Sequence, residues 1–251
     1  MKRSGEIYFI GAGPGDPELI TVKGLNIINR AGLIIYTGSL VSVQLFEQSK
    51  AEKIIDSSGL TLEQTHKLMI QAYLLGKLVA RVHTGDPSLF GTIREQTSLL
   101  EKDGVPFKII PGVTAAFAAA ARAKVSFTIP ETCQTLILTR ASGRTKVPSS
   151  QQLKKLAASR SSLAVYLSAT KAGSVQSDLL EGGMDHDTPV IIGWKVGWED
   201  ELIIKTDLAN LSREVKANNI AGQAVFLILP GNRKNNRSRL YDPDFSHGFR
   251  K

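Results

Sequence analysis

Cysteine is almost absent, because Cys133 is the single thiol among 251 residues. One thiol cannot form an intramolecular disulfide and cannot build a cysteine-based metal cluster. The sequence therefore excludes a disulfide-stapled extracellular domain and fits a reducing compartment. We expect Cys133 to be a buried and inert thiol.

Long hydrophobic runs are also absent. The longest, residues 115–121 and 224–229, are far shorter than the roughly 20 apolar residues that span a bilayer. The apolar stretch that follows Lys2 and Arg3 is interrupted by glycines at 11–15. It is therefore too short for the hydrophobic core of a signal peptide. We expect a cytoplasmic protein with no membrane partner.

Acidic residues are fewer than basic ones, 23 against 31, which gives a formal net charge of +8. Residues 232–251 hold six basic and two acidic side chains, so half of the excess lies there. The remainder of the chain weakly favours an acidic ligand and does not require nucleic acid. We interpret 232–251 as a basic, solvated tail.

What is present is the composition of a globular chain, 42% apolar and 22% charged, long enough for one large domain or two ordinary ones. In the first half, short β-branched runs alternate with segments of helical spacing, which predicts a mostly parallel sheet. The alternation of strand-like and helix-like segments is interrupted near Pro130. The closer spacing of the expected strands after it predicts a mixed sheet with a hairpin near Trp198. We therefore predict an α/β fold of two domains, 1–127 and 128–231.

The expected strands are short and apolar, and they lie at 7–10, 33–36, 53–56, 78–82, 107–110, 135–139, 163–167, 190–192, 202–205 and 224–229. Between the third and fourth of these, Thr61 and Gln64 have capping-box spacing and predict the start of a helix. We expect one side of this helix to carry Leu68, Met69, Ala72 and Leu75, and Gly76 to end it.

Three segments that follow predicted strands could carry chemistry. The first, 11–17 (GAGPGDP), permits tight turning and close approach to a ligand, but it lacks the third glycine of a dinucleotide fingerprint and the lysine of a P-loop. The second, 83–91 (HTGDPSLFG), could offer backbone groups to a polar ligand or could simply start a helix. The third, 111–116 (PGVTAA), could pack against a bulky ligand or against a neighbouring helix.

The three segments occupy equivalent positions in the predicted fold. Each follows a strand of the same predicted parallel sheet, so the loops should gather at its carboxyl edge, where open α/β sheets bind ligands. His83 has no partner at metal or triad spacing, and we interpret it as structural. In this combination and order, the chain resembles the tetrapyrrole (class III S-adenosylmethionine-dependent) methyltransferases over essentially its whole length to about Gly231.

Further segments resemble one branch of that family, the enzymes that methylate C-11 of precorrin-4 in cobalamin biosynthesis. These are 36–41 (YTGSLV), 56–61 (DSSGLT) and 138–148 (LTRASGRTKVP). The uroporphyrinogen-III branch instead has an aspartate at the position of Thr37 and a lysine near the position of Asp56. This chain lacks both groups, which counts against that substrate. The substrate's metal state, and hence the aerobic or anaerobic route, stays open.

The resemblance implies that S-adenosylmethionine lies in a cleft between the two domains. Carried over by motif, the cofactor-binding residues are Pro14, Thr84, Gly85, Asp86, Leu89, Thr114, Ala115, Leu167 and Val196. The last two belong to looser motifs of the second domain, where an ordinary buried position is the alternative.

The implied reaction moves an already activated methyl group, so alignment and exclusion of water suffice. We therefore nominate no catalytic acid or base and no metal site. For the carboxylate-rich tetrapyrrole we expect contacts from Tyr36, Thr37, Gly38 and Ser39 and from the basic side chains Arg140, Arg144 and Lys146, although a solvated basic loop is the alternative for the latter. The resemblance also implies a homodimer.

Other classes are disfavoured. A nicotinamide-dependent oxidoreductase would need an acidic residue at the end of the second strand, where Tyr36 and Thr37 stand. A nucleic-acid-binding protein could use the basic tail, but the sequence shows no zinc-finger, helix-turn-helix or RNP1 pattern. A corrin-pathway methyltransferase acting at another ring position remains the nearest alternative.

Overall fold

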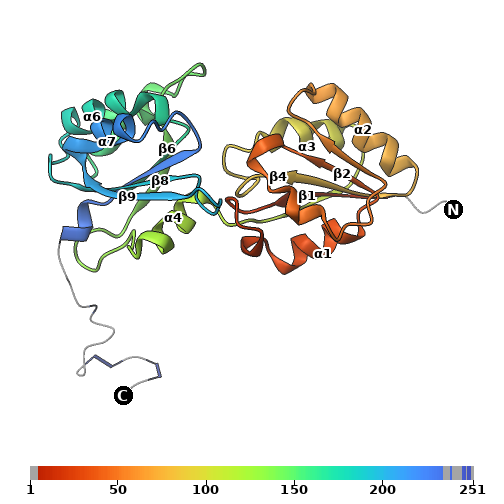
Figure 1. Cartoon of the computed structure of the whole chain (residues 1–251), viewed down its shortest axis with the longest axis horizontal. Helices are drawn as coiled ribbons and strands as arrows, with labels where there is room; N and C mark the ends of the chain where they lie inside the picture. Colours follow the sequence, from red (N-terminus) through yellow and green to blue (C-terminus); the bar gives the residue numbers. More distant parts are fainter. Residues whose placement is uncertain (1–4, 234–237, 239–244, 247, 250–251) are drawn as a thin grey trace. The chain divides into compact units, whose positions relative to one another are not determined.

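The computed structural model describes residues 5–233, 238, 245–246 and 248–249. It contains two compact units (Figure 1). The described residues up to Ala118 together with Gly197–Glu199 form the first unit, and the other described residues form the second. Most of the predicted tail, 232–251, lies outside the described residues, and the predicted boundary after residue 127 stays a prediction. Among the described residues, no helix is long and apolar enough to cross a membrane.

The first unit contains a five-stranded sheet in the order β3-β2-β4-β1-β5, and all four strand pairings are parallel. Its strands are β1 (Glu6–Gly11), β2 (Leu33–Tyr36), β3 (Lys53–Asp56), β4 (Leu78–His83) and β5 (Phe107–Ile110). Its helices are α1 (Val22–Arg30), α2 (Leu62–Leu74) and α3 (Ile93–Lys102), with short 3-10 helices at Pro17–Leu19, Gly38–Leu40 and Val43–Phe46. This confirms the predicted parallel sheet.

Helices cover both faces of this sheet, as a parallel sheet requires. Alternate strand residues such as Ile10 and Ile34 pack with Ile28 of α1, whereas Phe9 and Ile35 face Met69 of α2. Figure 1 shows α1 on one side of the sheet and α2 with α3 on the other. Burial on both faces explains why the inner strands β1, β2 and β4 are rich in apolar residues, whereas the edge strands β3 and β5 are largely exposed.

The helix α2 begins as predicted, with both hydrogen bonds of the capping box between Thr61 and Gln64. Met69 and Ala72 are buried, but the prediction was wrong for Leu75, which is 73% exposed. Leu75 is the C-cap residue, because Gly76 adopts a φ of +77° and turns the chain there. The helical spacing therefore stops one residue before this leucine.

The second unit contains a mixed sheet in the order β6-β7-β10-β8-β9, in which β6 and β7 are parallel and the other pairings antiparallel. Its strands are β6 (Leu136–Arg140), β7 (Ser162–Tyr166), β8 (Pro189–Trp194), β9 (Leu202–Asp207) and β10 (Ala224–Ile228). Its helices are α5 (Leu153–Ala157), α6 (Ala172–Glu181) and α7 (Leu211–Ala217), and 3-10 helices lie at Ser149–Gln151, Ala169–Lys171, Leu208–Asn210 and Pro230–Arg233. The chain passes between the units within α4 (Ala115–Ala123).

The mixed sheet and the β8–β9 hairpin confirm the sequence prediction for this half. Cys133 is buried and free, as expected, and its sulfur accepts a hydrogen bond from the Ser162 backbone N–H at 3.2 Å. The prediction was wrong in placing Leu167 inside a strand, because β7 ends at Tyr166 and Leu167 has a φ of +53°.

Candidate active site

The three candidate loops meet at the carboxyl edge of the first unit's sheet. The Ala12 N–H donates to the His83 carbonyl oxygen at 2.8 Å, and Gly13 and Gly85 exchange two backbone hydrogen bonds of 3.3 and 2.7 Å. These bonds join the loop after β1 to the loop after β4. The gathering predicted from strand order is therefore confirmed by direct backbone contacts.

Glycines make this junction possible because the loops approach at backbone distance. A Cβ atom added to Gly112 would lie 2.1 Å from the Gly85 carbonyl oxygen and 2.7 Å from the Gly11 Cα. One added to Gly11 would lie 2.6 Å from the same Gly85 oxygen. Since real Cβ atoms do not approach backbone this closely, the third loop can dock on the first two only with glycine at both positions.

The Asp86 carboxylate fixes the second loop to the third. One oxygen accepts a hydrogen bond from the Ser88 N–H at 2.8 Å, and the other accepts one from the Gly112 N–H at 2.9 Å. Charged acceptors make comparatively strong bonds to backbone N–H groups. Asp86 is thus a positioning residue of the loop junction, and its predicted direct contact with a cofactor stays a prediction.

The sequence analysis missed Trp198 as part of this region. Residues Gly197–Glu199 belong to the first unit, and the Trp198 indole N–H donates to the Pro14 carbonyl oxygen at 3.2 Å. A Cβ on Gly15 would lie 2.5 Å from the indole ring. The only sequence signal was the large aromatic in the predicted hairpin, and nothing in the spacing connects it to a loop 184 positions earlier.

The remaining predicted residues of the loops differ in exposure. Pro14 and Thr114 are buried, whereas Thr84, Gly85, Asp86, Leu89 and Ala115 are partly exposed. Gly85 has a φ of +60°, and the nearest atom to an added Cβ there is 3.9 Å away. The distance is ordinary van der Waals contact, so the space beside the Gly85 Cα is bordered by the Thr114 backbone.

His83 lies directly beneath the junction and is 2% exposed. Burial, with a smaller contribution from the Arg81 charge, lowers the pKa of its imidazole to about 3. Its ring packs against Phe9 with centroids 5.9 Å apart. The ring is therefore neutral at physiological pH and sits inside the sheet layer, as expected of a structural histidine.

In the second unit, Leu167 and Val196 occupy different environments. Leu167 is 72% exposed. Its backbone adopts the left-handed region, which is a costly conformation for a bulky residue. The Ser168 hydroxyl holds this turn by donating to the Tyr166 carbonyl and accepting from the Ala141 N–H, at 2.6 and 2.9 Å. Val196 is buried and packs near Gly193 of β8.

The predicted substrate residues fall into two groups, one in each unit. Tyr36, Thr37, Gly38 and Ser39 continue from the end of β2, where the Tyr36 ring packs against Phe46 at 5.3 Å.

Arg140 braces the basic loop that follows β6. Its guanidinium donates to the carbonyls of Ala141, Thr145 and Lys146 at 3.1 to 3.3 Å. The side chains of Arg144 and Lys146 are exposed. Of the three basic residues, these two therefore present freely accessible charge.

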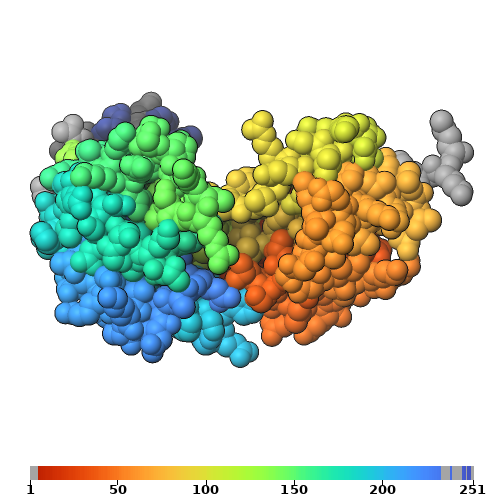
Figure 2. Space-filling model, turned by 90° about the horizontal axis from the view of Figure 1, so that it is seen from above, coloured from red at the N-terminus to blue at the C-terminus, as the bar shows by residue number. Residues whose placement is uncertain are grey.

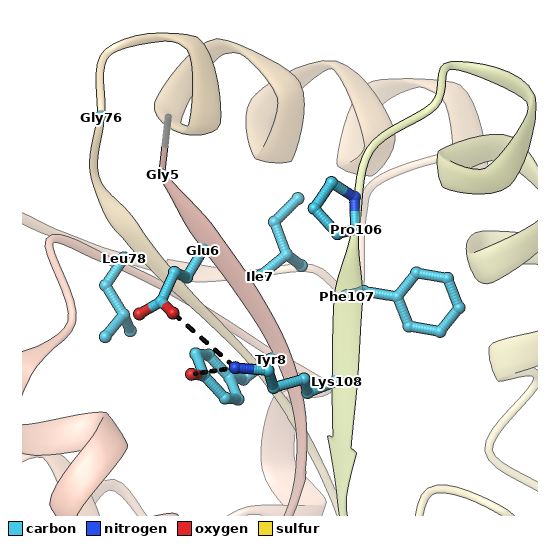
Figure 3. Close-up of a pocket in the computed structure, with 9 residues that line it drawn as sticks. All are labelled: Gly5, Glu6, Ile7, Tyr8, Gly76, Leu78, Pro106, Phe107 and Lys108. Atoms are coloured by element: carbon cyan, nitrogen blue, oxygen red, sulfur yellow. Dashed lines mark hydrogen bonds and ion pairs between the residues drawn. The ribbon is translucent and has the colours of Figure 1, made fainter. Parts of the chain in front are cut away.

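One pocket of the first unit lies at the opposite edge of the sheet, where β1, β4 and β5 begin (Figure 3). It encloses about 570 Å³. Figure 3 shows Lys108 between Glu6 and the Tyr8 hydroxyl, with N–O distances of 3.8 and 3.4 Å. None of the predicted site residues lines this pocket. The described residues also contain no cluster of three or more metal-ligating side chains.

Comparison with known proteins identifies relatives over nearly the whole chain. The sequence model of the Tetrapyrrole (Corrin/Porphyrin) Methylases matches residues 6–212. The chain is 44% identical to a cobalt-precorrin-4 C(11)-methyltransferase of Priestia megaterium, covering 98% of both chains. It is 42% identical to one of Methanocaldococcus jannaschii, covering 100% of this chain and 98% of the relative.

Solved structures show the same fold. The X-ray structure of a cobalt precorrin-4 methyltransferase, described as a cobalamin biosynthetic enzyme, superimposes with a TM-score of 0.87 at 44% identity, covering 89% of this chain and 94% of the other. A uroporphyrin-III C-methyltransferase of Thermus thermophilus in complex with S-adenosyl homocysteine has a TM-score of 0.76 at 23% identity, covering 94% and 96%. The latter likeness concerns the fold alone.

Proposed function

Because the chain belongs to the tetrapyrrole (corrin/porphyrin) methylases, we propose that it transfers a methyl group from S-adenosylmethionine to C-11 of precorrin-4 or its cobalt form. The observation that carries this proposal is the loop junction of Gly11, Gly85 and Gly112 at the carboxyl edge of a parallel sheet. It is the position at which open α/β sheets bind their ligands.

The ring position is supported by identity along the chain. Relatives named for methylation at C-11 reach 42 to 44% identity over nearly the full length, whereas a uroporphyrinogen-III C-methyltransferase of Bacillus subtilis is 30% identical over 232 residues. Two relatives with cobalt in their names are 44 and 42% identical to this chain and cover 98 and 100% of it. We therefore propose the cobalt-containing form as the preferred substrate.

The loop junction fits adenosylmethionine as methyl donor. It offers the partly exposed residues Thr84 and Gly85 and the small side chains of Thr114 and Ala115. When bound, the sulfonium supplies an electrophilic methyl group. We propose that Pro14, Leu89, Leu167 and Val196 contribute apolar contacts, and that Asp86 acts by holding the loops in place.

The chain's own task is then positioning. Alignment of the ring carbon with the methyl group is worth roughly 7–11 kcal/mol in favourable cases, and the closely packed loops provide a rigid support for it. His83 is buried and neutral, so it does not supply an acid. We assign no acid or base to the reaction.

The substrate carries many carboxylates, and the positive charge of the chain favours its approach. We propose that the segment from Tyr36 to Ser39 contacts the macrocycle, and that Arg144 and Lys146 pair with its carboxylates. We also propose a cytoplasmic homodimer, which light scattering after gel filtration would test.

The reaction can be tested with labelled donor. The purified protein is incubated with methyl-¹³C-labelled adenosylmethionine and either precorrin-4 or cobalt-precorrin-4, and the product is examined by NMR. We expect label on a carbon attached to C-11, with faster turnover of the cobalt form. Label at another ring position would support the alternative of a different corrin-pathway methyltransferase, and equal rates would remove the cobalt preference.

A further inference from the structure

Arg81, in β4, is a buried arginine that the proposed reaction does not use. The residue is 6% exposed. Its guanidinium donates to the Gln96 side-chain oxygen at 2.9 Å, to the Ser57 hydroxyl at 2.8 Å and to the Ile35 carbonyl at 3.4 Å. All three acceptors are neutral.

The charge of Arg81 lacks a counter-ion. In the part of the chain that the structure describes, no carboxylate oxygen lies within 4 Å of its nitrogens, and its Nη2 makes no hydrogen bond. Burial lowers the pKa of this guanidinium to about 10, so it remains charged at neutral pH. A buried charge without an opposite partner is costly, so an anion bound beside Arg81 would offset this cost.

A pocket of about 300 Å³ opens onto this arginine. It is also lined by Ser57, which follows β3, by Thr61 at the start of the helix α2, and by Thr92, Glu95 and Gln96 at the start of the helix α3. Thr92, the N-cap of α3, is in the left-handed region with a φ of 48° and makes no capping hydrogen bond. The positive end of α3 therefore adds to the field of Arg81.

None of the residues assigned to the cofactor lines this pocket. It is formed by β4, the segment after β3, and the helices α2 and α3. Both the backbone N–H and the hydroxyl of Ser57 donate to the Tyr36 carbonyl, at 2.9 and 2.7 Å. The pocket thus adjoins the segment that we assign to the macrocycle.

We infer that the pocket of Arg81, Ser57 and Gln96 binds a peripheral carboxylate of the tetrapyrrole substrate. This inference rests on the proposed function. The unused Nη2 of the guanidinium can donate to a carboxylate, which also matches its charge, and Ser57 and Gln96 hold the guanidinium in place through its other nitrogens. The helices α2 and α3, beside which the pocket lies, form the orange and yellow face of the first unit in Figure 2.

Glu95 is exposed and lines the same pocket, so its carboxylate would repel an anion bound there. This gives a variant that does not disturb the core. Glu95→Gln should lower the KM for the tetrapyrrole by about two- to threefold, the range of exposed charge interactions. The matched control is Glu101→Gln, on the same helix but outside the pocket, which should leave the KM unchanged.

Arg81→Gln and Arg81→Lys test the arginine itself. We expect Arg81→Gln to raise the KM for precorrin-4 about 10- to 100-fold through loss of a charge-assisted pair, with Arg81→Lys in between. Affinity for S-adenosylhomocysteine, measured by calorimetry, should stay within about twofold of wild type, because none of the residues assigned to this ligand lines the pocket. Weakened binding of both ligands would indicate a merely structural arginine and overturn the inference.

A second calorimetric arm separates the two possible sources of the carboxylate. 5′-Methylthioadenosine lacks the amino-acid part of S-adenosylhomocysteine. If Arg81→Gln weakens S-adenosylhomocysteine but not methylthioadenosine, the pocket holds the cofactor's carboxylate and our assignment to the substrate is wrong. Failure of the wild type to bind S-adenosylhomocysteine would instead refute the proposed function, so the two failures are distinguishable.

Discussion

At Gly112, a single hydrogen atom in place of a side chain lets the third loop dock against the other two. Gly112→Ala places a Cβ 2.1 Å from the Gly85 oxygen, so the loops must separate. We expect a loss of about 1–3 kcal/mol in unfolding free energy, as for overpacking, and at least tenfold weaker binding of S-adenosylhomocysteine. Gly222→Ala, where an added Cβ meets no atom within 4 Å, is the matched control. Equal affinity in both variants would refute the role of the junction.

Asp86 acts at the same junction through two backbone hydrogen bonds. Asp86→Ala leaves the Gly112 and Ser88 N–H groups without this acceptor, and we expect a loss of about 1–3 kcal/mol in urea unfolding. Asp86→Asn keeps one acceptor oxygen and should recover part of the loss. Identical stabilities of the two variants would contradict the bridging role.

His83 makes the stability depend on pH. Its pKa of about 3 in the folded state lies below the ordinary value of 6.5, so protons bind the unfolded chain more strongly. The contribution of neutral His83 to the free energy of unfolding is therefore fully present above pH 6.5. It is lost as the pH falls towards 3, by up to about 1.4 kcal/mol per pH unit. Urea unfolding at several pH values should show this slope, and His83→Gln should remove it. The exposed His186, changed to Gln, should leave the slope intact.

Among elements, the helix α2 offers the clearest test of a locally encoded start. Thr61→Ala removes the side-chain half of its capping box, and we expect a loss of about 1 kcal/mol in urea unfolding. Lys67→Ala, on the exposed side of the same helix, should change stability by less than about 0.5 kcal/mol. A Thr61 variant as stable as wild type would show that tertiary packing alone fixes this end.

The elements show what the sequence could and could not predict. The strands were predictable because each is an apolar run closed by turn residues, and α2 because its capping box is local. Leu75 and Leu167 were misplaced because the apolar pattern continues one residue past the end of the helix or strand. Arg81 gave no signal as a site, because a strand buried on both faces does not reveal which polar side chain meets a pocket.

For the whole molecule, the order of the strands was the strongest source of information. It placed three loops at one edge before any contact was known, and the Gly13–Gly85 bridge and the Asp86–Gly112 bond confirm it. Trp198 could not be predicted, because its bond to Pro14 joins parts of the chain that share no local pattern. The roles of Leu167 and Val196 stay predictions.

The central claim is that the loop junction of Gly11, Gly85 and Gly112 binds the methyl donor. The most direct measurement is calorimetric titration of the wild-type protein with S-adenosylhomocysteine, with NADH and a short duplex DNA as controls. We predict saturable binding of S-adenosylhomocysteine alone. No binding of it by the folded protein, together with saturable binding of NADH or DNA, would contradict the account.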